Sequence, residues 1–283
     1  MKLIKLKITP LSSFSTFPKG DMIFGYFAYI LFQRGDKRLQ NYLNENPKII
    51  ISDFFPDGYL TKPALPLSSF GIDDTQKKEF RKKNWIKIEN LQKGNFEFEE
   101  FSFFSNDLVV KNAINRKTFS TDDSGVFAPY SIEEINFIKQ PVCYVMYDEN
   151  EFSEDEILEI FNIMGSYGFG QKATIGKGQF KAIIKKSKFK DIDSKYYITL
   201  SPSLPTKKAY YNIFNRFGKY AYSNTPFKKP IVLADSSAVI VSEEKIEYIG
   251  KSIDNGIEKP SFIQGYSIVI PFEFDSKGLV WKI

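Results

Sequence analysis

The sequence predicts an α+β fold in which many short strands accompany two clear helices. The first ten residues alternate apolar and lysine side chains, as expected of a strand that is buried on one face. Apolar residues recur at helical spacing in two later segments, 22–32 and 157–164, and strand-like runs lie between and after them. The first half of the chain therefore has the order strand, helix, strands, helix, strand, which suits a ferredoxin-like βαββαβ core.

The first helix is expected to begin at Asp21, which can act as its N-cap, and to end at Gly35. Its residues are apolar on nearly every side, so we expect the core to enclose it. The polar residues 36–46 favour a second, short helix, and residues 49–51 favour a strand. The charged stretch 73–87 is typical of an exposed helix that leads into a strand.

Residues 108–110 predict a strand that runs into a polar, basic loop, 111–118. Ser153 and Glu156 have the spacing of a capping box and predict the start of the second clear helix, which we expect to end at Gly165. The next strand should place lysines on one face and three apolar side chains on the other: Phe180, Ala182 and Ile184. Additional strands are expected around Val126 and at residues 135–138 and 142–147.

Residues 185–195 are polar and basic, and we place a domain boundary within them. We expect an N-terminal domain of residues 1–190 and a C-terminal domain of residues 191–283. The C-terminal part contains mostly strand-like segments, at 196–200, 210–214, 231–233, 238–241, 248–249 and 266–272.

The composition excludes several classes of site. The chain has 283 residues, 42% of them hydrophobic, which is ample for a folded core. It has no histidine, the usual general base at neutral pH and the commonest ligand of transition metals. Its single cysteine, Cys143, can form neither an internal disulfide nor a zinc or iron–sulfur centre, and we expect it to be buried. We therefore expect no metal and no cofactor.

The same features bear on localisation and on the partners of the chain. A single cysteine, which cannot form an internal disulfide, is typical of a protein in the reducing cytoplasm. The N-terminus lacks the apolar core and the cleavage site of a signal peptide, and the longest apolar run, 22–32, is too short to span a bilayer. We expect a cytoplasmic protein without a membrane partner. The net charge of +5 is too small to indicate nucleic-acid binding by itself, so the case for such binding depends on where the basic residues lie in the sequence.

The clearest candidate for a binding site is the glycine-rich segment that begins at Gly165. Five glycines lie within residues 165–178, and residues 172–190 carry seven lysines without any Asp or Glu. Glycine lets a backbone approach a ligand closely, and consecutive N–H groups can bind phosphate oxygens. The spacing fits neither a Walker A loop nor a G-x-G-x-x-G motif, and the loop runs from a helix into a strand, the reverse of both motifs.

A nucleic-acid backbone is therefore the ligand that this segment favours. The alternative is a glycine-rich hairpin whose lysines only face solvent. The residues expected to contact RNA here are Gly168, Phe169, Gly170, Gln171, Lys172, Thr174 and Lys177.

Two other segments offer groups for an anion or a base. The loop 111–118 supplies hydrogen-bond donors and a guanidinium that can stack on a base, through Asn112, Asn115, Arg116, Lys117 and Thr118. A solvated hairpin tip is the alternative there. The loop before the first helix presents N–H groups of a helix N-terminus at Gly20, with Lys19 beside them. Possible stacking surfaces are Phe119, Tyr167 and Phe169.

The loop before the first helix, the loop 111–118 and the glycine-rich segment, in this order along the chain, resemble the RAMP superfamily of CRISPR proteins. More specifically, the chain resembles the fourth Csm subunit of type III-A effector complexes, which is related to the Cas-five family. The resemblance extends over nearly the whole chain. It is carried by residues 17–25, 51–56, 59–63, 115–118, 168–180, 200–205, 216–218 and 264–266.

The resemblance implies two ferredoxin-like (RRM-like) domains with insertions, of which the second is degenerate and the first carries a thumb-like hairpin. It implies a non-catalytic subunit that binds the repeat-derived 5′ tag of crRNA. It also implies contacts with a large polymerase-like subunit on one side and a backbone subunit on the other. The hairpin would kink the RNA near the boundary between tag and guide, and the segment 216–218 adds Arg216 to the expected RNA contacts.

Three alternatives stay open on the sequence. A RAMP-type endoribonuclease that processes crRNA would need Tyr or Lys in place of the usual histidine. A backbone subunit that cleaves target RNA would use a loop aspartate, which here would be Asp21. An assembly scaffold would leave its lysines facing solvent.

Overall fold

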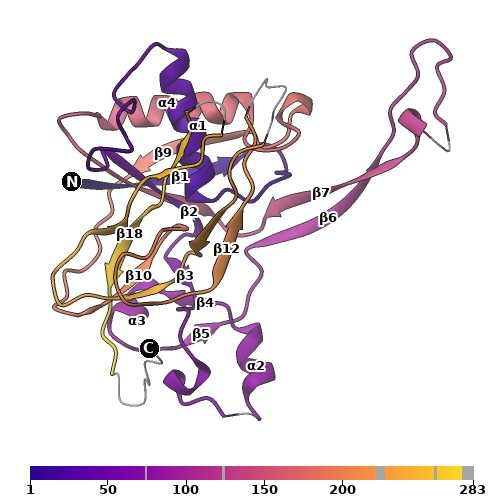
Figure 1. Ribbon diagram of the computed structural model, residues 1–283. Helices are drawn as coiled ribbons and strands as arrows, with labels where there is room; N and C mark the ends of the chain where they lie inside the picture. The colour runs from indigo at the N-terminus through magenta and orange to yellow at the C-terminus, as the bar shows by residue number, and fades with distance from the viewer. Residues whose placement is uncertain (74, 123–124, 221–226, 258–259, 276–283) are drawn as a thin grey trace.

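The computed structural model describes residues 1–73, 75–122, 125–220, 227–257 and 260–275 (Figure 1). Its α-helices are α1 (Gly20–Gln33), α2 (Lys77–Lys82), α3 (Ile88–Gln92) and α4 (Glu154–Tyr167), and short 3₁₀ turns span Leu67–Phe70, Gly125–Phe127 and Ala173–Ile175. The strands of the first part are β1 (Lys2–Pro10), β2 (Ile49–Pro56), β3 (Tyr59–Thr61), β4 (Trp85–Lys87), β5 (Phe98–Glu99), β6 (Phe104–Lys111), β7 (Tyr130–Phe137), β8 (Pro141–Tyr147) and β9 (Phe180–Lys185). Those of the second part are β10 (Tyr196–Thr199), β11 (Ala209–Tyr210), β12 (Ile213–Arg216), β13 (Ile231–Ala234), β14 (Val239–Val241), β15 (Tyr248–Gly250), β16 (Ile253–Asp254), β17 (Phe262–Ile263) and β18 (Tyr266–Pro271).

The N-terminal sheet has the strand order β2-β8-β1-β9, and each pair of neighbours is antiparallel. Strand β1 lies between β8 and β9 and buries Ile4, Leu6 and Ile8. Helix α1 packs on β2, helix α4 packs on β9, and the two helices contact each other at the upper end of the molecule (Figure 1). The order β1, α1, β2, β8, α4, β9 is the order that the sequence predicts for the first half.

Helix α1 starts two residues earlier than an Asp21 N-cap would place it and does not use Asp21 as its cap. The N-cap is Lys19, whose side chain makes no capping hydrogen bond, and the Asp21 carboxylate in the first turn pairs with Arg216. The expectation of an Asp21 cap is wrong because a partner far along the chain binds this carboxylate. The expected end is confirmed, since Gly35 has a φ of 77° and its N–H donates to the carbonyl oxygen of Phe32.

The expected helix at residues 36–46 is wrong, and the start of α4 is confirmed. Residues 36–46 form turns, in which the Arg38 guanidinium binds the carboxylates of Asp36 and Glu156. At the start of α4 the Ser153 hydroxyl accepts a hydrogen bond of 3.2 Å from the backbone N–H of Glu156. Because the Glu156 carboxylate reaches Arg38, the same side chain anchors the turns to α4.

Two further expectations are corrected. Val126 lies in a 3₁₀ turn and not in a strand. Helix α4 continues past Gly165 to Tyr167, because Gly165 is the point where the Phe180 backbone crosses the helix. A Cβ atom on Gly165 would clash with the carbonyl oxygen of Phe180. A glycine selected for close packing is indistinguishable, in one sequence, from a glycine that ends a helix.

A long insertion separates β2 from β8. It contains the three-stranded sheet β3-β4-β5 with the short helices α2 and α3, followed by the antiparallel hairpin of β6 and β7. This hairpin projects far from the body of the molecule (Figure 1). Its base is fixed to the body where the backbones of Phe14 and Ile135 exchange two hydrogen bonds, of 2.9 and 2.7 Å.

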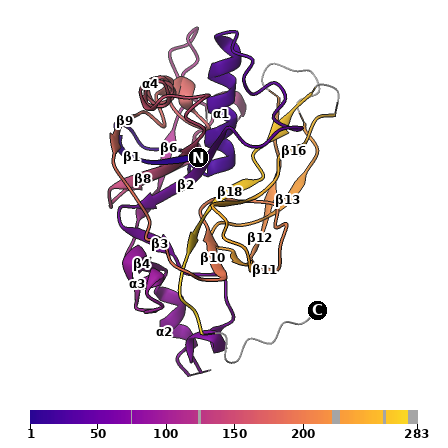
Figure 2. The same ribbon diagram turned by 90° about the vertical axis from the view of Figure 1, so that its left-hand side faces the viewer.

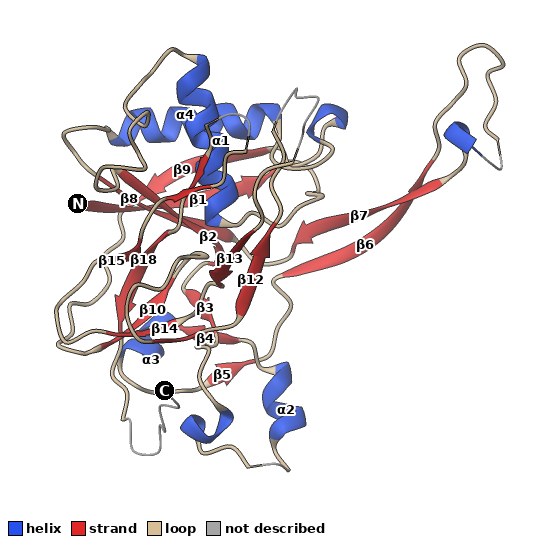
Figure 3. Cartoon of the chain, in the orientation of Figure 1, coloured by secondary structure: helices blue, strands red, loops and turns tan. Residues whose placement is uncertain are grey.

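The C-terminal part forms a second sheet with the order β11-β14-β10-β18-β15, and the pairs β12–β13 and β16–β17 form two separate two-stranded sheets. The described residues between 191 and 275 contain no helix. Figure 2 shows these strands, coloured orange to yellow, along one side of the N-terminal half. The helices lie at the two ends of a body that consists mainly of strands (Figure 3).

The two halves share one hydrophobic core, which includes residues from both sides of position 190. At their junction the buried Gln264 side chain binds both the N–H and the carbonyl oxygen of Ile51, at 2.9 and 2.8 Å. Gly20 allows this approach, because a Cβ atom there would clash with the Ile51 carbonyl and lie 2.7 Å from Cβ of Ser201. A boundary near residue 190 stays a prediction, and the halves on either side of it pack as one body.

Candidate nucleic-acid interface

The glycine-rich loop joins the end of α4 to the start of β9 and is anchored to residues 12–16. The N–H of Gly178 donates to the Ser13 carbonyl oxygen (2.8 Å), and the N–H of Gln171 donates to the Thr16 hydroxyl (3.2 Å). Within the loop, the N–H of Phe169 donates to the Gly178 carbonyl oxygen (2.9 Å). These hydrogen bonds close the loop on itself and attach it to residues 12–16.

The tip of this loop presents backbone N–H groups to solvent. Four of them make no hydrogen bond within the described part of the chain, namely those of Gly170, Lys172, Ala173 and Thr174. Gly170 and Lys172 have φ values of 81° and 63°, so the backbone here turns through left-handed conformations. Such a run of unpaired N–H groups in alternating backbone conformations is a recurrent binding site for phosphate oxygens.

The structure separates the two lysines that the sequence had placed in this site. Lys172 is exposed, has no acidic partner among the described residues, and holds its Nζ 5.5 Å from the centre of the Tyr130 ring on the hairpin. Lys177 is mostly buried, with its Nζ 2.5 Å from a carboxylate oxygen of Glu134 and 2.7 Å from the Ser13 hydroxyl. Lys172 is free to meet a phosphate, whereas Lys177 ties the loop to strand β7 at the base of the hairpin.

We expect the Lys177–Glu134 contact to stabilise the fold only above acidic pH. Hydrogen bonds from Lys177 and Ser13 lower the pKa of Glu134 below its ordinary value of 4.5. The contact is therefore fully present above pH 4.5 and is lost as the pH falls through the lower pKa of the folded state. The variant Lys177→Met should lose about 1–2 kcal/mol of unfolding free energy at pH 7 and less at pH 4.

Chemical denaturation of both proteins at the two pH values measures this difference. The same replacement in a Glu134→Gln background serves as the control, because without the carboxylate the cost of Lys177→Met should be the same at both pH values. A Lys177→Met loss that is equal at pH 7 and pH 4 would contradict the assignment.

A basic groove of about 580 Å³ lies beside the loop, between α1, Gly168–Gly170 and the region after β12. Lys219 and Lys228 line it and have no acidic partner within the part of the chain that the structure describes. Burial lowers the pKa of Lys228. Uncompensated cations around a groove attract an anionic strand, so the groove continues the site from the loop tip. Nothing in the spacing of Lys219 and Lys228 marked them in the sequence.

Arg216 also lines the groove but is held by an internal partner. Its Nε and Nη2 atoms lie 2.6 and 2.8 Å from the two carboxylate oxygens of Asp21, whose side chain is fully buried. Both oxygens of Asp21 are thus bound by a guanidinium. A nucleolytic role for Asp21 would require an accessible carboxylate, and this geometry does not provide one.

Lys19 and Gly20 are occupied by protein groups as well. The Lys19 Nζ lies 2.5 Å from a carboxylate oxygen of Asp235 and 3.4 Å from one of Asp53, and the Gly20 N–H donates to Asp53 over 2.7 Å. Burial raises the pKa of Asp53, and the Lys19 charge opposes this shift. The start of α1 therefore binds a carboxylate of the chain itself. An RNA contact by Lys19 and Gly20 stays a prediction, and their observed contacts are structural.

The tip of the β6–β7 hairpin forms a second, separate cluster, remote from the glycine-rich loop (Figure 1). Asn115 organises it, since its side chain accepts a hydrogen bond of 3.0 Å from the Lys117 N–H and its own N–H donates to Ser120. Phe119 is 86% exposed, so its ring is available for stacking. The structure places Asn112, Asn115, Arg116, Lys117 and Thr118 together at this tip and does not bring them to the loop.

Two aromatic residues of the loop region differ in their exposure. Phe169 is only 2% exposed and packs against Tyr26 with ring centres 6.4 Å apart, so its ring belongs to the core and can offer RNA only its backbone. The expected stacking by the Phe169 ring is therefore wrong. Tyr167 is 68% exposed and remains available. The sequence could not separate these two residues, because both flank the same glycine.

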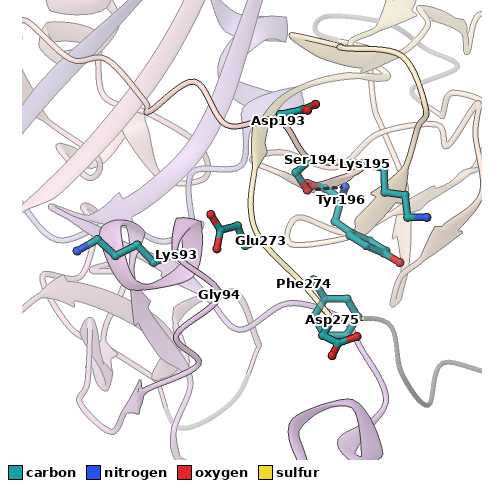
Figure 4. Close-up of a pocket in the computed structure, with 9 residues that line it drawn as sticks. All are labelled: Lys93, Gly94, Asp193, Ser194, Lys195, Tyr196, Glu273, Phe274 and Asp275. Atoms are coloured by element: carbon teal, nitrogen blue, oxygen red, sulfur yellow. Dashed lines mark hydrogen bonds between the residues drawn. The ribbon is translucent and has the colours of Figure 1, made fainter.

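Another pocket lies far from this site, between the residues that follow α3, the start of β10 and the residues that follow β18 (Figure 4). Lys93 and Lys195 line it together with three acidic residues, Asp193, Glu273 and Asp275. Acidic groups outnumber basic ones there, so the pocket does not suit a nucleic-acid backbone.

Neither a membrane-spanning helix nor a cluster of metal ligands occurs among the described helices and acidic residues. None of these helices has both the length and the hydrophobicity needed to cross a membrane. Over the same residues, no three Cys, Asp or Glu side chains come together as ligands for a metal ion.

Comparison with known proteins gives one sequence relative and several structures of similar fold. No family model matches the chain. The protein "CRISPR system Cms protein Csm4" of Thermococcus onnurineus (strain NA1) is 27% identical over 226 residues, which cover 73% of this chain and 76% of the relative.

Two solved complexes contain a chain of similar fold. One is a Csm1–Csm4 cassette in complex with pppApA, with a TM-score of 0.62, 17% identity, and coverage of 96% of this chain and 98% of that chain. The other is a Csm3–Csm4 subcomplex of the type III-A CRISPR-Cas interference complex, with a TM-score of 0.61, 17% identity, and coverage of 96% and 100%. The similarity in fold therefore extends over almost the entire chain.

Proposed function

We propose, from the premise that this chain is a Csm4-like RAMP protein, that it binds the repeat-derived 5′ tag of crRNA in a type III-A Csm effector complex. The observation that carries the proposal is the set of four unpaired N–H groups at the loop tip, those of Gly170, Lys172, Ala173 and Thr174, beside the basic groove. Backbone N–H groups and lysines bind phosphates without reading bases, which suits a subunit that holds a backbone in place.

The proposed partners follow from the complexes in which similar chains occur. Solved structures pair Csm4 with Csm1 and, separately, with Csm3. We propose that this chain likewise bridges the large polymerase-like subunit to the backbone subunits. The hairpin of β6 and β7 would act as the thumb that kinks the RNA, and antiviral defence by the complex would take place in the cytoplasm.

The finer fold assignment is part of the same proposal. The sheet order β2-β8-β1-β9 with α1 and α4 supports a ferredoxin-like N-terminal domain. The C-terminal strands, which carry no helix in the described residues, support a degenerate second domain of the same kind. Large insertions, above all β3 to β7, distinguish the first domain from the minimal βαββαβ unit.

We also propose that the subunit has no catalytic activity. The sequence has no histidine, and the carboxylate of Asp21 is buried against Arg216. Incubation of the pure protein with repeat RNA tests this point. Clean cleavage at one site would instead favour a processing endoribonuclease, and loss of target cleavage in assembled complexes that carry Asp21→Asn would favour a catalytic backbone subunit.

The replacement Lys172→Ala tests the RNA site directly. It should weaken the binding of tag-bearing RNA and reduce the slope of log affinity against log salt by about 0.7, because one phosphate contact is lost. Lys188→Ala is the matched control, since Lys188 is an exposed lysine that does not line the groove. Equal salt slopes for the wild type and Lys172→Ala would remove this lysine from the site.

A further inference from the structure

A second hollow lies on the far side of Tyr26 from the basic groove. It has a volume of about 790 Å³ and is bounded by α1, by the last turn of α4 and by Ala173 and Thr174 of the loop tip. Tyr26, Tyr29 and Ala173 line both this hollow and the groove, so the two adjoin each other. We refer to this second hollow as the tyrosine cleft.

The aromatic character of the tyrosine cleft follows from helical spacing. Tyr26, Tyr29 and Gln33 occupy positions i, i+3 and i+7 of α1 and therefore share one face of the helix. The rings of Tyr26 and Tyr29 are nearly parallel, at 11°, with centres 6.1 Å apart. Tyr167, the last residue of α4, lines the same hollow. Tyr29 and Tyr167 are 42% and 68% exposed, so the aromatic surface is formed in advance and open to solvent.

The polar groups of the cleft carry little charge. Burial, with the hydroxyl groups of Tyr29 and Tyr167 nearby, raises the pKa of Tyr26, so its phenol stays neutral. The charge of Arg34 is taken up by Glu159, 2.7 Å away. Gln33 contributes an amide that can both donate and accept. Neutral aromatic faces with a few hydrogen-bonding groups match a nucleobase better than they match a phosphate.

The position of the cleft relates it to the phosphate site. Ala173 and Thr174, whose unpaired N–H groups belong to the loop tip, are also lining residues of the cleft. An RNA strand with one phosphate bound at that tip would have the adjoining base at the entrance of the cleft. Its volume is within the range of about 300–1,000 Å³ that is typical of small-ligand pockets.

We infer that the tyrosine cleft is a stacking subsite for one unpaired base of the RNA whose backbone the glycine-rich loop holds. This inference rests on the proposed function and adds to it a position at which a base, and not only a phosphate, is bound. The exposed faces of Tyr29 and Tyr167 hold the base, and Gln33 and the phenolic hydroxyls meet its edge. Tyr26 is a positioning residue, because its ring packs on the buried Phe169.

The test uses the full chain and a synthetic single-stranded RNA that carries the tag. In one series of oligonucleotides, a single abasic ribose replaces each nucleotide in turn. The variant Tyr29→Ala/Tyr167→Ala should bind the intact RNA about tenfold more weakly than the wild type, as expected for the loss of one stacked base. The variant Tyr29→Phe/Tyr167→Phe keeps both aromatic faces and should bind within about twofold of the wild type.

The abasic series supplies the decisive comparison. At one position, the abasic RNA should bind equally to the wild type and to the alanine variant, because the base that distinguishes them is missing. The salt slope of the alanine variant should equal that of the wild type, since no charge is changed. Circular dichroism checks that the variants fold, which we expect because both side chains are largely exposed.

Three results would overturn the inference. One is that the alanine variant binds intact RNA as tightly as the wild type does, while Lys172→Ala still weakens binding. The proposed function then stands, and the stacking subsite is wrong. A second is a loss of wild-type affinity that is the same at every abasic position, so that no single base is distinguished. A third is unchanged RNA binding combined with weaker association with the large or backbone subunit, which would assign the cleft to a protein partner. If the wild type itself binds no tag RNA, the proposed function fails.

Discussion

Replacing Arg216 by alanine is expected to lower the free energy of unfolding by about 3–5 kcal/mol. Asp21 is fully buried, and Arg216 binds both of its carboxylate oxygens, at 2.6 and 2.8 Å. Without the guanidinium, a buried carboxylate loses its counter-ion, and this penalty exceeds the net contribution of the intact pair. Chemical denaturation followed by circular dichroism at neutral pH measures the change.

A double variant separates this effect from a simple loss of packing. Asp21→Asn combined with Arg216→Ala removes the buried charge together with its partner and should regain most of the lost stability. Asp21→Asn alone should cost less than Arg216→Ala, because the Arg216 side chain remains 19% exposed and can be hydrated. A loss below about 1 kcal/mol in Arg216→Ala would mean that the pair contributes no more than an ordinary surface ion pair.

Gly178→Ala is expected to cost at least about 3 kcal/mol of stability and to abolish most of the RNA affinity of the loop. Gly178 has a φ of 73°, and a Cβ atom there would lie 2.6 Å from the Phe169 backbone nitrogen and clash with the Phe169 carbonyl. The substitution therefore combines left-handed strain with a backbone collision. Because the N–H of Gly178 also anchors the loop to Ser13, the tip would lose its position.

Gly176→Ala is the matched control for this prediction. Gly176 lies in the same loop with a φ of 84°, but a Cβ atom there would meet nothing within 4 Å. It should cost only the strain of a left-handed alanine, about 1–2 kcal/mol, and leave RNA affinity nearly unchanged. Denaturation and filter binding of the two variants provide the comparison. Equal losses in both would show that the close approach of Phe169 and Gly178 is not what holds the loop.

Much of the secondary structure could be predicted from the sequence, because periodicity reports burial directly. The alternation in β1 and the apolar face of α1 gave their positions to within one or two residues. The errors arose where a distant residue decided the outcome. Asp21 has the sequence features of a cap, yet it pairs with Arg216, and Gly165 resembles a helix end, yet it makes room for Phe180.

The candidate site could be predicted only in part, because local composition reveals the loop but does not reveal which distant residues contact it. Glycine and lysine content marks the loop, but only the fold shows that Lys172 is free while Glu134 engages Lys177. The sequence around the two lysines is similar in composition. They differ in their contacts, because Glu134 at the base of the hairpin lies beside Lys177 and not beside Lys172. The groove and the tyrosine cleft arise between elements that are far apart in the chain, so no local pattern could indicate that Lys219 or Tyr29 lines a hollow.

The interior position of β1 has a consequence for synthesis on the ribosome. Its strand partners, β8 and β9, span Pro141–Tyr147 and Phe180–Lys185, so the nascent chain carries an unpaired β1 while they are made. At about 5–20 residues per second, this interval lasts roughly 10–35 s. Lys5 and Lys7 alternate with Leu6 and Ile8 in this strand, and charged side chains at such positions disfavour the association of an unpaired strand with other unfinished chains.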